Sequence, residues 1–402
     1  MRILYAGQSL AEPRGGGELS ARALVWAISR SHDIRVVGAA SRTEQRSLAP
    51  GCEIFDYAMP PTLGLPRQPG LTATERSFRG VVADHIERFA PEVVMLQQPS
   101  WLAPSDLPAT ATLVLFIRSA LCFAAWDPNP SLWRRAVAWP FAAARFRSYR
   151  PLLDRADLIV TNSGYMRDEL WRRRGVRSVA VPPLIMNGSA EQYLPASNAD
   201  ARIAFVGLGP WKGGDLSIRI AAASPRRRFL FLAGNRASAA LRLAAERLEN
   251  VEVLDWTSDI HAAFRRTRLL LMPSRWAEPF GRVAVEAASH GVPTIATAIG
   301  GIPEAVGDGG VLIPPASGLS RWRDAIELLD DPRRFEQCAT AALAHARQFD
   351  FDKILGRLQT ALHEHGGVHL PLVPGSASEF AMWSRNLEAG LANSARANGS
   401  LS

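Results

Sequence analysis

The sequence contains 402 residues, of which 47% are hydrophobic and 21% charged, a composition typical of globular proteins. This length suggests two domains of about 100–200 residues each, and the apolar content excludes disorder over most of the chain. The 46 basic and 38 acidic residues give a net charge of +8, and all but two of the basic residues, Lys212 and Lys353, are arginines.

Apolar strands alternate with amphipathic helices along the chain. Strands are expected at residues 2–6, 34–39, 93–97, 112–117, 158–161 and 179–181, with a first helix at 18–30. After a polar stretch, a second series is expected at 203–206, 229–232, 251–254, 269–272, 294–297 and 311–313. This alternation predicts βαβ units and parallel sheets. We therefore expect an α/β protein of two doubly wound, Rossmann-like domains facing a cleft, with ligands beyond the carboxyl ends of the strands.

The same pattern gives the expected domain boundaries. An N-terminal domain covers residues 1–185, a linker 186–200, a C-terminal domain 201–370 and a tail 371–402. The tail contains a short helical pattern at 379–391. It is interpreted either as a helix that crosses back to the N-terminal domain or as a frayed end.

The cysteines and the N-terminus indicate the cellular compartment in which the protein works. Cys52, Cys122 and Cys338 are odd in number and far apart, so they predict neither a zinc site nor a disulfide framework. Reduced thiols are typical of cytoplasmic proteins. No signal peptide precedes the first strand, and no apolar run approaches the ~20 residues that span a bilayer. We expect a cytoplasmic, bacterial protein, with a peripheral position at the inner face of the membrane left open.

The first candidate motif is the glycine-rich loop at residues 13–17, between the first strand and the first helix. Glycines at a helix N-terminus let backbone N–H groups approach an anion, and the helix dipole favours negative charge there. The loop therefore predicts a phosphate contact. A merely flexible connection between strand and helix is the alternative.

A second glycine-rich loop, residues 206–214, opens the second series. It lacks the Gly-Lys-Ser/Thr of a Walker loop and the glycine spacing of a dinucleotide-binding fingerprint. Lys212 lies at its tip, where a compact ammonium group would neutralise a phosphate. The alternative is a solvated surface lysine.

The segment 273–293 carries two carboxylates. Glu278 lies in a turn after a strand, and Glu286 lies in a helix that should begin near Gly281 and stop at Gly291. With about 1.5 Å of rise per residue, the two carboxylates are at most roughly 12 Å apart along the helix axis. Backbone N–H groups at the positive helix end lie between them. This pattern suits a nucleotide sugar, whereas the alternative is an exposed helix residue and a partner of the helix dipole.

The ordered set of motifs resembles the family 4, or group 1, retaining glycosyltransferases of the GT-B fold. Residues 274–297 resemble the family signature with its paired glutamates, and the matching flanking stretches are 13–17, 157–163, 300–304, 308–310 and 328–332. The resemblance implies transfer of a sugar from a nucleoside-diphosphate sugar. The acceptor would be a glycan, a lipid-linked molecule or a small molecule, and neither a cofactor nor a metal ion would be required.

The resemblance also implies residue roles. Glu286 would hold the ribose hydroxyls, and Glu278 would contact the donor sugar together with the backbone of Phe280 and Gly281. Lys212 would bind the diphosphate and stabilise the leaving group, which makes Lys212 and Glu278 catalytic candidates. The remaining donor contacts would come from Gly16, Gly17, Gly209, Gly213, Trp256, Thr257 and Arg282.

Two positions depart from the family pattern. Leu208 stands where the family often has an arginine, so a diphosphate cation is missing, and Arg118, Arg275 or Arg282 would have to replace it. Arg118 also follows the strand after which the family often carries a histidine. We include Arg118 among the catalytic candidates, with a structural ion pair as the alternative.

The sequence also contains features of other functions. The Trp- and Arg-rich stretch 132–155 suits an anionic membrane surface, but Pro140 interrupts it and favours an ordinary helical hairpin. The arginines are scattered and accompany no nucleic-acid motif, so we expect no nucleic-acid partner. The alternatives to a glycosyltransferase are a non-catalytic GT-B scaffold that binds sugar nucleotides, an epimerase and a pseudo-glycosidic coupling enzyme.

Overall fold

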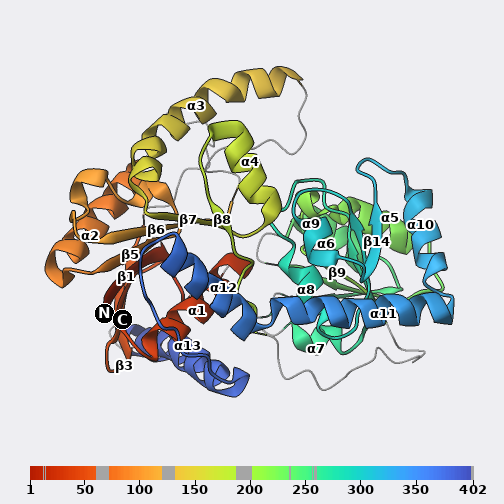
Figure 1. The fold of residues 1–402 in the computed structure, drawn as a ribbon. Helices are drawn as coiled ribbons and strands as arrows, with labels where there is room; N and C mark the ends of the chain where they lie inside the picture. The colour runs from red at the N-terminus through yellow and green to blue at the C-terminus, as the bar shows by residue number, and fades with distance from the viewer. Residues whose placement is uncertain are drawn as a thin grey trace. The chain divides into compact units, whose positions relative to one another are not determined.

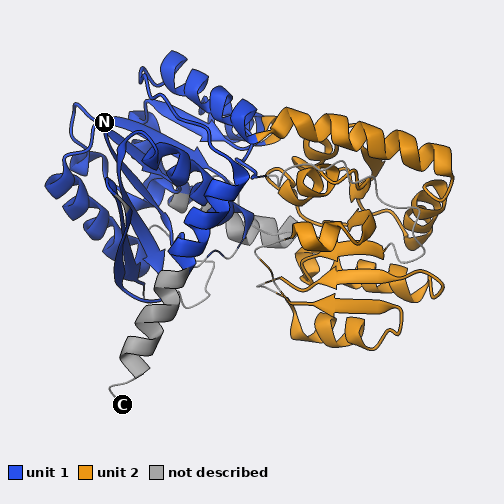
Figure 2. Ribbon diagram, turned by 90° about the horizontal axis from the view of Figure 1, so that it is seen from below, with its two compact units in different colours: residues 1–162, 166–186, 351–402 blue, residues 163–165, 187–350 orange. Residues whose placement is uncertain are grey.

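The chain forms two compact units, each built around its own sheet (Figure 2). The computed structural model describes residues 1–399 except 12, 14, 60–71, 120–131, 187–201, 235–236, 256 and 258–259, and leaves out the side chains of 49, 132–142, 145 and 389–399. Unit 1 comprises residues 1–162, 166–186 and 351–402, and unit 2 comprises 163–165 and 187–350. The expected linker therefore lies almost wholly outside the described residues, as does Trp256.

The sheet of unit 1 has the strand order β3-β4-β2-β1-β5-β6-β7-β8. Its strands are β1 (Arg2–Gln8), β2 (Asp33–Ala40), β3 (Glu44–Ala49), β4 (Cys52–Ala58), β5 (Val93–Leu96), β6 (Thr112–Ile117), β7 (Leu158–Thr161) and β8 (Val179–Ala180). All neighbours are parallel except β3 and β4. The six strands expected here are confirmed. The strands β3 and β4 are additional to the expected series, and β3 is a polar edge strand without an apolar run.

The helices of unit 1 are α1 (Gly16–Ser29), α2 (Ala73–Phe89), η1 (Pro99–Trp101), η2 (Pro104–Asp106), α3 (Leu132–Arg155), most of α4 (Gly164–Arg174), α12 (Phe351–Glu364) and α13 (Ala377–Gly399). The start of α2 is fixed by a capping box, in which Thr72 Oγ1 accepts from Glu75 N and Glu75 Oε2 accepts from Thr72 N.

The expectation that Pro140 interrupts the stretch 132–155 is wrong, because α3 runs through it as one helix. A proline removes one backbone donor, and a long helix can continue past that loss with a local bend. The membrane alternative for this stretch depends on side chains at 132–142, which lie outside the described part. No helix in the described ranges is both long and apolar enough to cross a membrane.

The C-terminal part of the chain packs within unit 1. The predicted second domain extends to residue 370, whereas unit 2 ends at Asp350, because the apolar face of α12 is buried in unit 1. Trp26 of α1 contacts both C-terminal helices, with ring centroids 5.9 Å from Phe351 and 5.4 Å from Phe380. Figure 1 shows α13 beside α1. As far as its side chains are described, the tail is therefore a helix that packs against unit 1.

The sheet of unit 2 is wholly parallel, with the order β11-β10-β9-β12-β13-β14. Its strands are β9 (Arg202–Val206), β10 (Phe229–Leu232), β11 (Val251–Leu254), β12 (Thr267–Met272), β13 (Thr294–Thr297) and β14 (Gly310–Ile313), which confirms the expected series. Its helices are η4 (Pro210–Lys212), α5 (Gly214–Ala222), α6 (Ala239–Glu246), α7 (His261–Phe264), α8 (Arg282–Ala288), α9 (Ile302–Val306), α10 (Leu319–Leu328), α11 (Pro332–Ala346) and η5 (Arg347–Phe349).

Strand order fixes where ligands can bind in each sheet. In unit 2 the chain winds outward from β9 through β10 to β11, and then returns to the other side of β9 with β12. The crevice at such a reversal, beyond the carboxyl ends of the strands, is the usual ligand site of doubly wound sheets. The loops after β9 and β12 meet there. In unit 1 the corresponding reversal lies between β1 and β5.

Candidate functional site

The loop between β9 and α5 is held in a tight conformation by glycine. Gly213 has a φ of +78°, and a Cβ there would lie 2.1 Å from the carbonyl oxygen of Pro273. The backbone N–H of Arg275 donates to Trp211 O over 2.8 Å. These contacts fix the loop against the start of the segment that follows β12. They place Lys212, the last residue of η4, at the end of the loop.

Lys212 and Glu278 form an ion pair in this crevice. Lys212 Nζ lies 2.8 Å from Glu278 Oε2, and the two side chains are 33% and 7% exposed. The buried hydroxyl of Ser274 donates to Glu278 Oε1, so both carboxylate oxygens are engaged. The pocket around the pair is lined by Phe205, Val206, Lys212, Leu271, Met272, Ser274, Glu278 and Val283. The structure thus brings the predicted site residues Lys212 and Glu278 into contact, and it shows Ser274 as a further partner of Glu278.

A glycine pair supports the turn that carries Glu278. The N–H of Gly301 donates to Glu278 O over 2.7 Å. Gly300 has a φ of +64°, and a Cβ on it would lie 2.5 Å from Glu278 O. A Cβ on Gly301 would lie 2.6 Å from Pro279 O. A side chain at either glycine would displace the turn, so these glycines fix the position of Glu278.

The second predicted carboxylate lies on α8, which confirms the helix expected after Gly281. Gly281 caps the helix with a φ of +111°. Glu286 is buried one turn into α8, where Arg282 Nε donates to its Oε1 over 2.5 Å. The ring of Phe280 is buried, with its centroid 5.4 Å from that of Phe349. Phe280 can therefore offer a ligand its backbone only.

Each predicted carboxylate is paired with a predicted cation: Glu278 with Lys212, and Glu286 with Arg282. Pairing offsets the cost of burying these charges. Carboxylates accept hydrogen bonds from sugar hydroxyls, and ammonium and guanidinium groups donate to phosphate oxygens. A ligand that carries both hydroxyls and phosphates can therefore replace each pair by two new contacts.

The position where the family often has an arginine, Leu208, lies in the core of unit 2. Leu208 is fully buried and belongs to the core of unit 2, with Phe205 and Leu216. The two candidate replacements in this unit both hold ion pairs: Arg275 with Asp215, and Arg282 with Glu286. Of these, Arg282 lies beside a predicted site carboxylate.

Two further donor contacts were predicted at the edges of this site. The N–H of Gly209 donates to Gly207 O over 2.7 Å, and its carbonyl accepts from Lys212 N over 3.2 Å. The backbone of Gly209 is therefore used by the turn itself. Thr257 is exposed in the loop after β11, and its neighbour Trp256 is outside the described residues.

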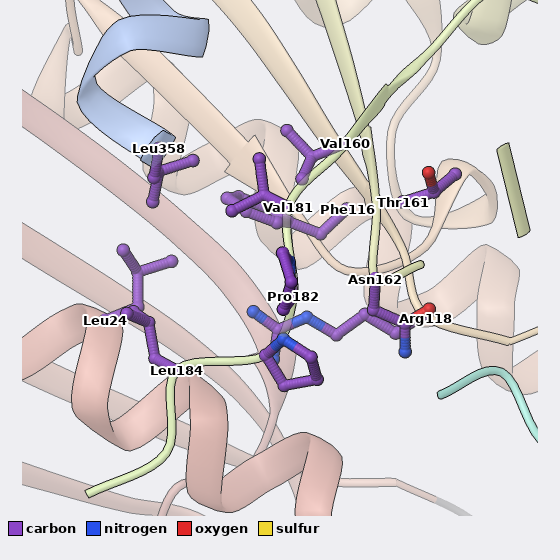
Figure 3. A pocket seen from close by; sticks show the side chains of 11 residues that line it. Leu24, Phe116, Arg118, Val160, Thr161, Asn162, Val181, Pro182, Leu184 and Leu358 are labelled. Atoms are coloured by element: carbon purple, nitrogen blue, oxygen red, sulfur yellow. The ribbon is translucent and has the colours of Figure 1, made fainter. Parts of the chain in front are cut away.

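Unit 1 brings Arg118 and the first glycine loop together. Gly16 and Gly17 are the first residues of α1, and Arg118 Nη1 donates to Gly17 O over 2.9 Å. The guanidinium of Arg118 also lies 5.2 Å from the ring centroid of Phe116. A pocket here is lined by Leu24, Phe116, Arg118, Val160, Thr161, Asn162, Val181, Pro182, Pro183, Leu184 and Leu358 (Figure 3). Buried Asn162 Oδ1 has no hydrogen-bond partner among the described residues.

Two family models match the chain. Residues 200–331 match "Glycosyl transferases group 1", and residues 15–184 match "Glycosyl transferase 4-like domain". The D-inositol 3-phosphate glycosyltransferase of Mycolicibacterium smegmatis is 28% identical over 77% of this chain and 74% of its own length. The protein of the same name from Corynebacterium aurimucosum is 28% identical over 58% of this chain. The chain spans 62% of the length of that relative.

Solved structures share the fold. Sucrose-phosphate synthase from Thermosynechococcus elongatus superposes with a TM-score of 0.70 at 18% identity, covering 90% of this chain and 99% of the other. Anabaena Alr3699/HepE, solved in complex with UDP-glucose, gives a TM-score of 0.65 at 20% identity, covering 90% and 99%. WaaG, described as a glycosyltransferase involved in lipopolysaccharide biosynthesis, gives 0.64 at 16% identity, covering 91% and 100%. These likenesses establish two Rossmann-like sheets of the GT-B type.

Proposed function

Because the chain belongs to the group 1 glycosyltransferases, we propose that it transfers a sugar from a nucleoside-diphosphate sugar to an acceptor hydroxyl, with retention of anomeric configuration. One observation carries this proposal. The ion pair between Lys212 and Glu278 lines a pocket at the strand-order reversal of the sheet in unit 2. The acceptor would be a glycan, a lipid-linked molecule or a small molecule.

We propose that the donor exchanges its groups with the two ion pairs. The ribose hydroxyls would bind Glu286, and the donor sugar would bind Glu278 and the backbone at Phe280 and Gly281. The diphosphate would bind Lys212. The support for these roles is that both carboxylates are buried next to a cation. Fixed charges aimed at a leaving group stabilise it most when its charge develops, in the transition state.

In the proposed reaction, the acceptor oxygen bonds to the anomeric carbon as the bond from that carbon to the phosphate oxygen breaks. The departing phosphate takes the acceptor proton on the same face of the sugar, so no enzymatic nucleophile is required. We propose that Lys212, with the backbone amides of Gly16 and Gly17, neutralises the leaving diphosphate without a metal ion. Arg118 would hold the glycine loop through its bond to Gly17 O.

Two relatives suggest the first substrates to test. The Anabaena structure contains UDP-glucose, which makes a uridine diphosphate sugar the first donor. The actinobacterial relatives are named for an inositol phosphate, which makes a phosphorylated polyol one acceptor class.

Calorimetric titration with UDP, GDP, ADP, TDP and CDP, at fixed salt and with and without magnesium, tests the donor site. We expect one diphosphate, UDP first, to bind tightly without magnesium. Glu286→Ala should weaken that binding by about tenfold or more, because hydrogen bonds to a charged group contribute about 1.5–3 kcal/mol. Unchanged affinity would remove the ribose assignment. Binding without transfer to any acceptor would instead favour the non-catalytic scaffold.

A further inference from the structure

A buried arginine connects the C-terminal helix to the first glycine loop. Arg22 lies on α1, and its side chain is 1% exposed. Its Nε donates to Leu10 O over 2.5 Å, and its Nη2 donates to Ala11 O over 3.3 Å. Its Nη1 donates to Ser384 Oγ over 2.9 Å and to Glu388 Oε1 over 2.6 Å. One guanidinium thus bonds to two segments that are more than 360 residues apart in sequence.

The two segments that Arg22 contacts both belong to unit 1. Leu10 and Ala11 are buried at the start of the loop that leads from β1 to Gly16. Ser384 and Glu388 are four residues apart on α13, so both project from the same face of that helix. Leu387 is fully buried beside them. The α13 helix is therefore seated where its polar face meets Arg22.

Glu388 offsets part of the cost of burying the Arg22 charge. Desolvation lowers the pKa of the Arg22 guanidinium, while the hydrogen bond to Glu388 opposes that shift. Removing one partner of a buried ion pair leaves an uncompensated charge, which is strongly destabilising. Without Glu388, we expect the guanidinium to turn toward water. The carbonyls of Leu10 and Ala11 would then lose their donors, and the start of the loop would be released.

We propose that Arg22 is a positioning residue for sugar transfer, and that α13 fixes the glycine loop through it. This inference rests on the proposed function, in which the amides of Gly16 and Gly17 contact the diphosphate. The loop is held at its start by Arg22 and at Gly17 by Arg118, whose Nη1 donates to Gly17 O. The C-terminal helix then supports sugar transfer by holding the glycine loop in place through Arg22.

The experiment compares Glu388→Ala and Glu388→Gln with Glu379→Gln in the full-length chain. Glu379 of α13 forms a more exposed ion pair, 3.6 Å long, with Arg30, the residue that follows α1, and this pair does not involve Arg22. Amide hydrogen exchange of residues 15–19, kcat and the Kd for UDP are measured for each variant. Glu388→Ala should speed exchange and lower kcat, each by about tenfold or more, since small misplacements are costly in active sites. The Kd for UDP should change less than kcat. Glu388→Gln should bring the exchange rate and kcat part of the way back to the wild-type values. Glu379→Gln should leave the exchange rate and kcat unchanged.

Unchanged exchange at residues 15–19 in Glu388→Ala would overturn the connection through Arg22. Faster exchange with unchanged kcat would overturn the positioning role. If Glu388→Ala fails to fold, Ser384→Ala, which removes a single hydrogen bond from Arg22, gives the same comparison. If the wild-type protein uses no sugar nucleotide, the proposed function fails, and the exchange data alone decide whether α13 holds the loop.

Discussion

The two glycine-rich loops occupy equivalent places, each after the first strand of its unit's sheet, yet their glycines serve different purposes. In the loop after β9, Gly207 and Gly213 have φ values of +93° and +78°. A Cβ on Gly213 would overlap the carbonyl of Pro273. In the loop after β1, Gly15 is extended, and a Cβ on Gly17 would meet no atom within 4 Å. The fold requires glycine in the second loop but not at Gly17.

This difference separates structure from function in motifs that look alike. The second loop uses its glycines to make a turn, and the group that we propose for phosphate binding there is a side chain, Lys212. The first loop offers backbone amides, which a small residue leaves accessible to a ligand. We therefore expect substitution of a glycine to affect folding in the second loop and ligand binding in the first.

The largest effect should come from restoring the family arginine in the second loop. Leu208→Arg places a guanidinium in the core of unit 2, and we expect a loss of about 4 kcal/mol or more, the range of a buried unpaired charge. Leu208→Met should cost under about 1.5 kcal/mol. Urea unfolding measures both. A stable Leu208→Arg protein that binds UDP more tightly would show that the loop can accommodate the missing cation.

The next effect tests whether the second loop acts through Lys212. Lys212→Ala should lower kcat by about 10²–10³, the range for one group that stabilises developing charge, and should weaken UDP binding less. The control is Lys353→Ala, which removes the other lysine from an exposed position on α12. Steady-state kinetics and calorimetry give the two values. Equal losses in kcat and binding would show that Lys212 does not favour the transition state.

Exchanging glycine for alanine in the second loop measures its structural role. Gly213→Ala introduces a Cβ against Pro273 O at a positive φ, and we expect a loss of stability of about 1–3 kcal/mol or more. Thermal unfolding of the purified variant is the measurement. An unchanged melting temperature would mean that the turn relaxes without cost, and the contrast with the first loop would disappear.

The matching exchange in the first loop should affect catalysis instead. Gly17→Ala lies in the first turn of α1, where alanine stabilises a helix by about 0.5–1 kcal/mol relative to glycine. We expect an unchanged or higher melting temperature and a kcat about tenfold lower, because a methyl group would crowd the amides near the diphosphate. Wild-type kcat in Gly17→Ala would indicate that this loop is only a connection.

The smallest effect provides a baseline away from both loops. Arg227 lies at the amino edge of the sheet in unit 2, and its hydrogen bonds to Asp330 lower the pKa of that carboxyl. A lowered pKa stabilises the fold above the unfolded value, about 3.9, and that stability is lost as the pH falls through the lower folded pKa. Asp330→Asn should cost about 0.5–1 kcal/mol at pH 7, and the difference should shrink as the pH falls through the lowered pKa of Asp330. We expect a wild-type kcat for this variant. Thermal unfolding at several pH values measures the loss of stability.

The sequence predicts the elements well and the contacts between distant elements poorly. Apolar runs such as β6 and β10 locate the buried strands, because strands covered on both faces are mostly apolar. The edge strand β3 escapes that rule, since its residues are polar. The pairing of Arg22 with Glu388 depends on how α13 docks, which no local pattern contains. Within the site, the segment around Glu278 is recognisable, but the burial of Leu208 follows only from the packed core.

The return of α12 and α13 to unit 1 has a consequence for synthesis of the protein. Unit 2 is almost continuous in sequence, whereas unit 1 needs residues from both sides of it. Chains emerge from the ribosome N-terminus first, at about 5–20 residues per second. The segment made first must therefore wait for residues beyond 350 before Trp26 and Arg22 are covered. The residues of unit 2 are therefore all available before those that complete unit 1.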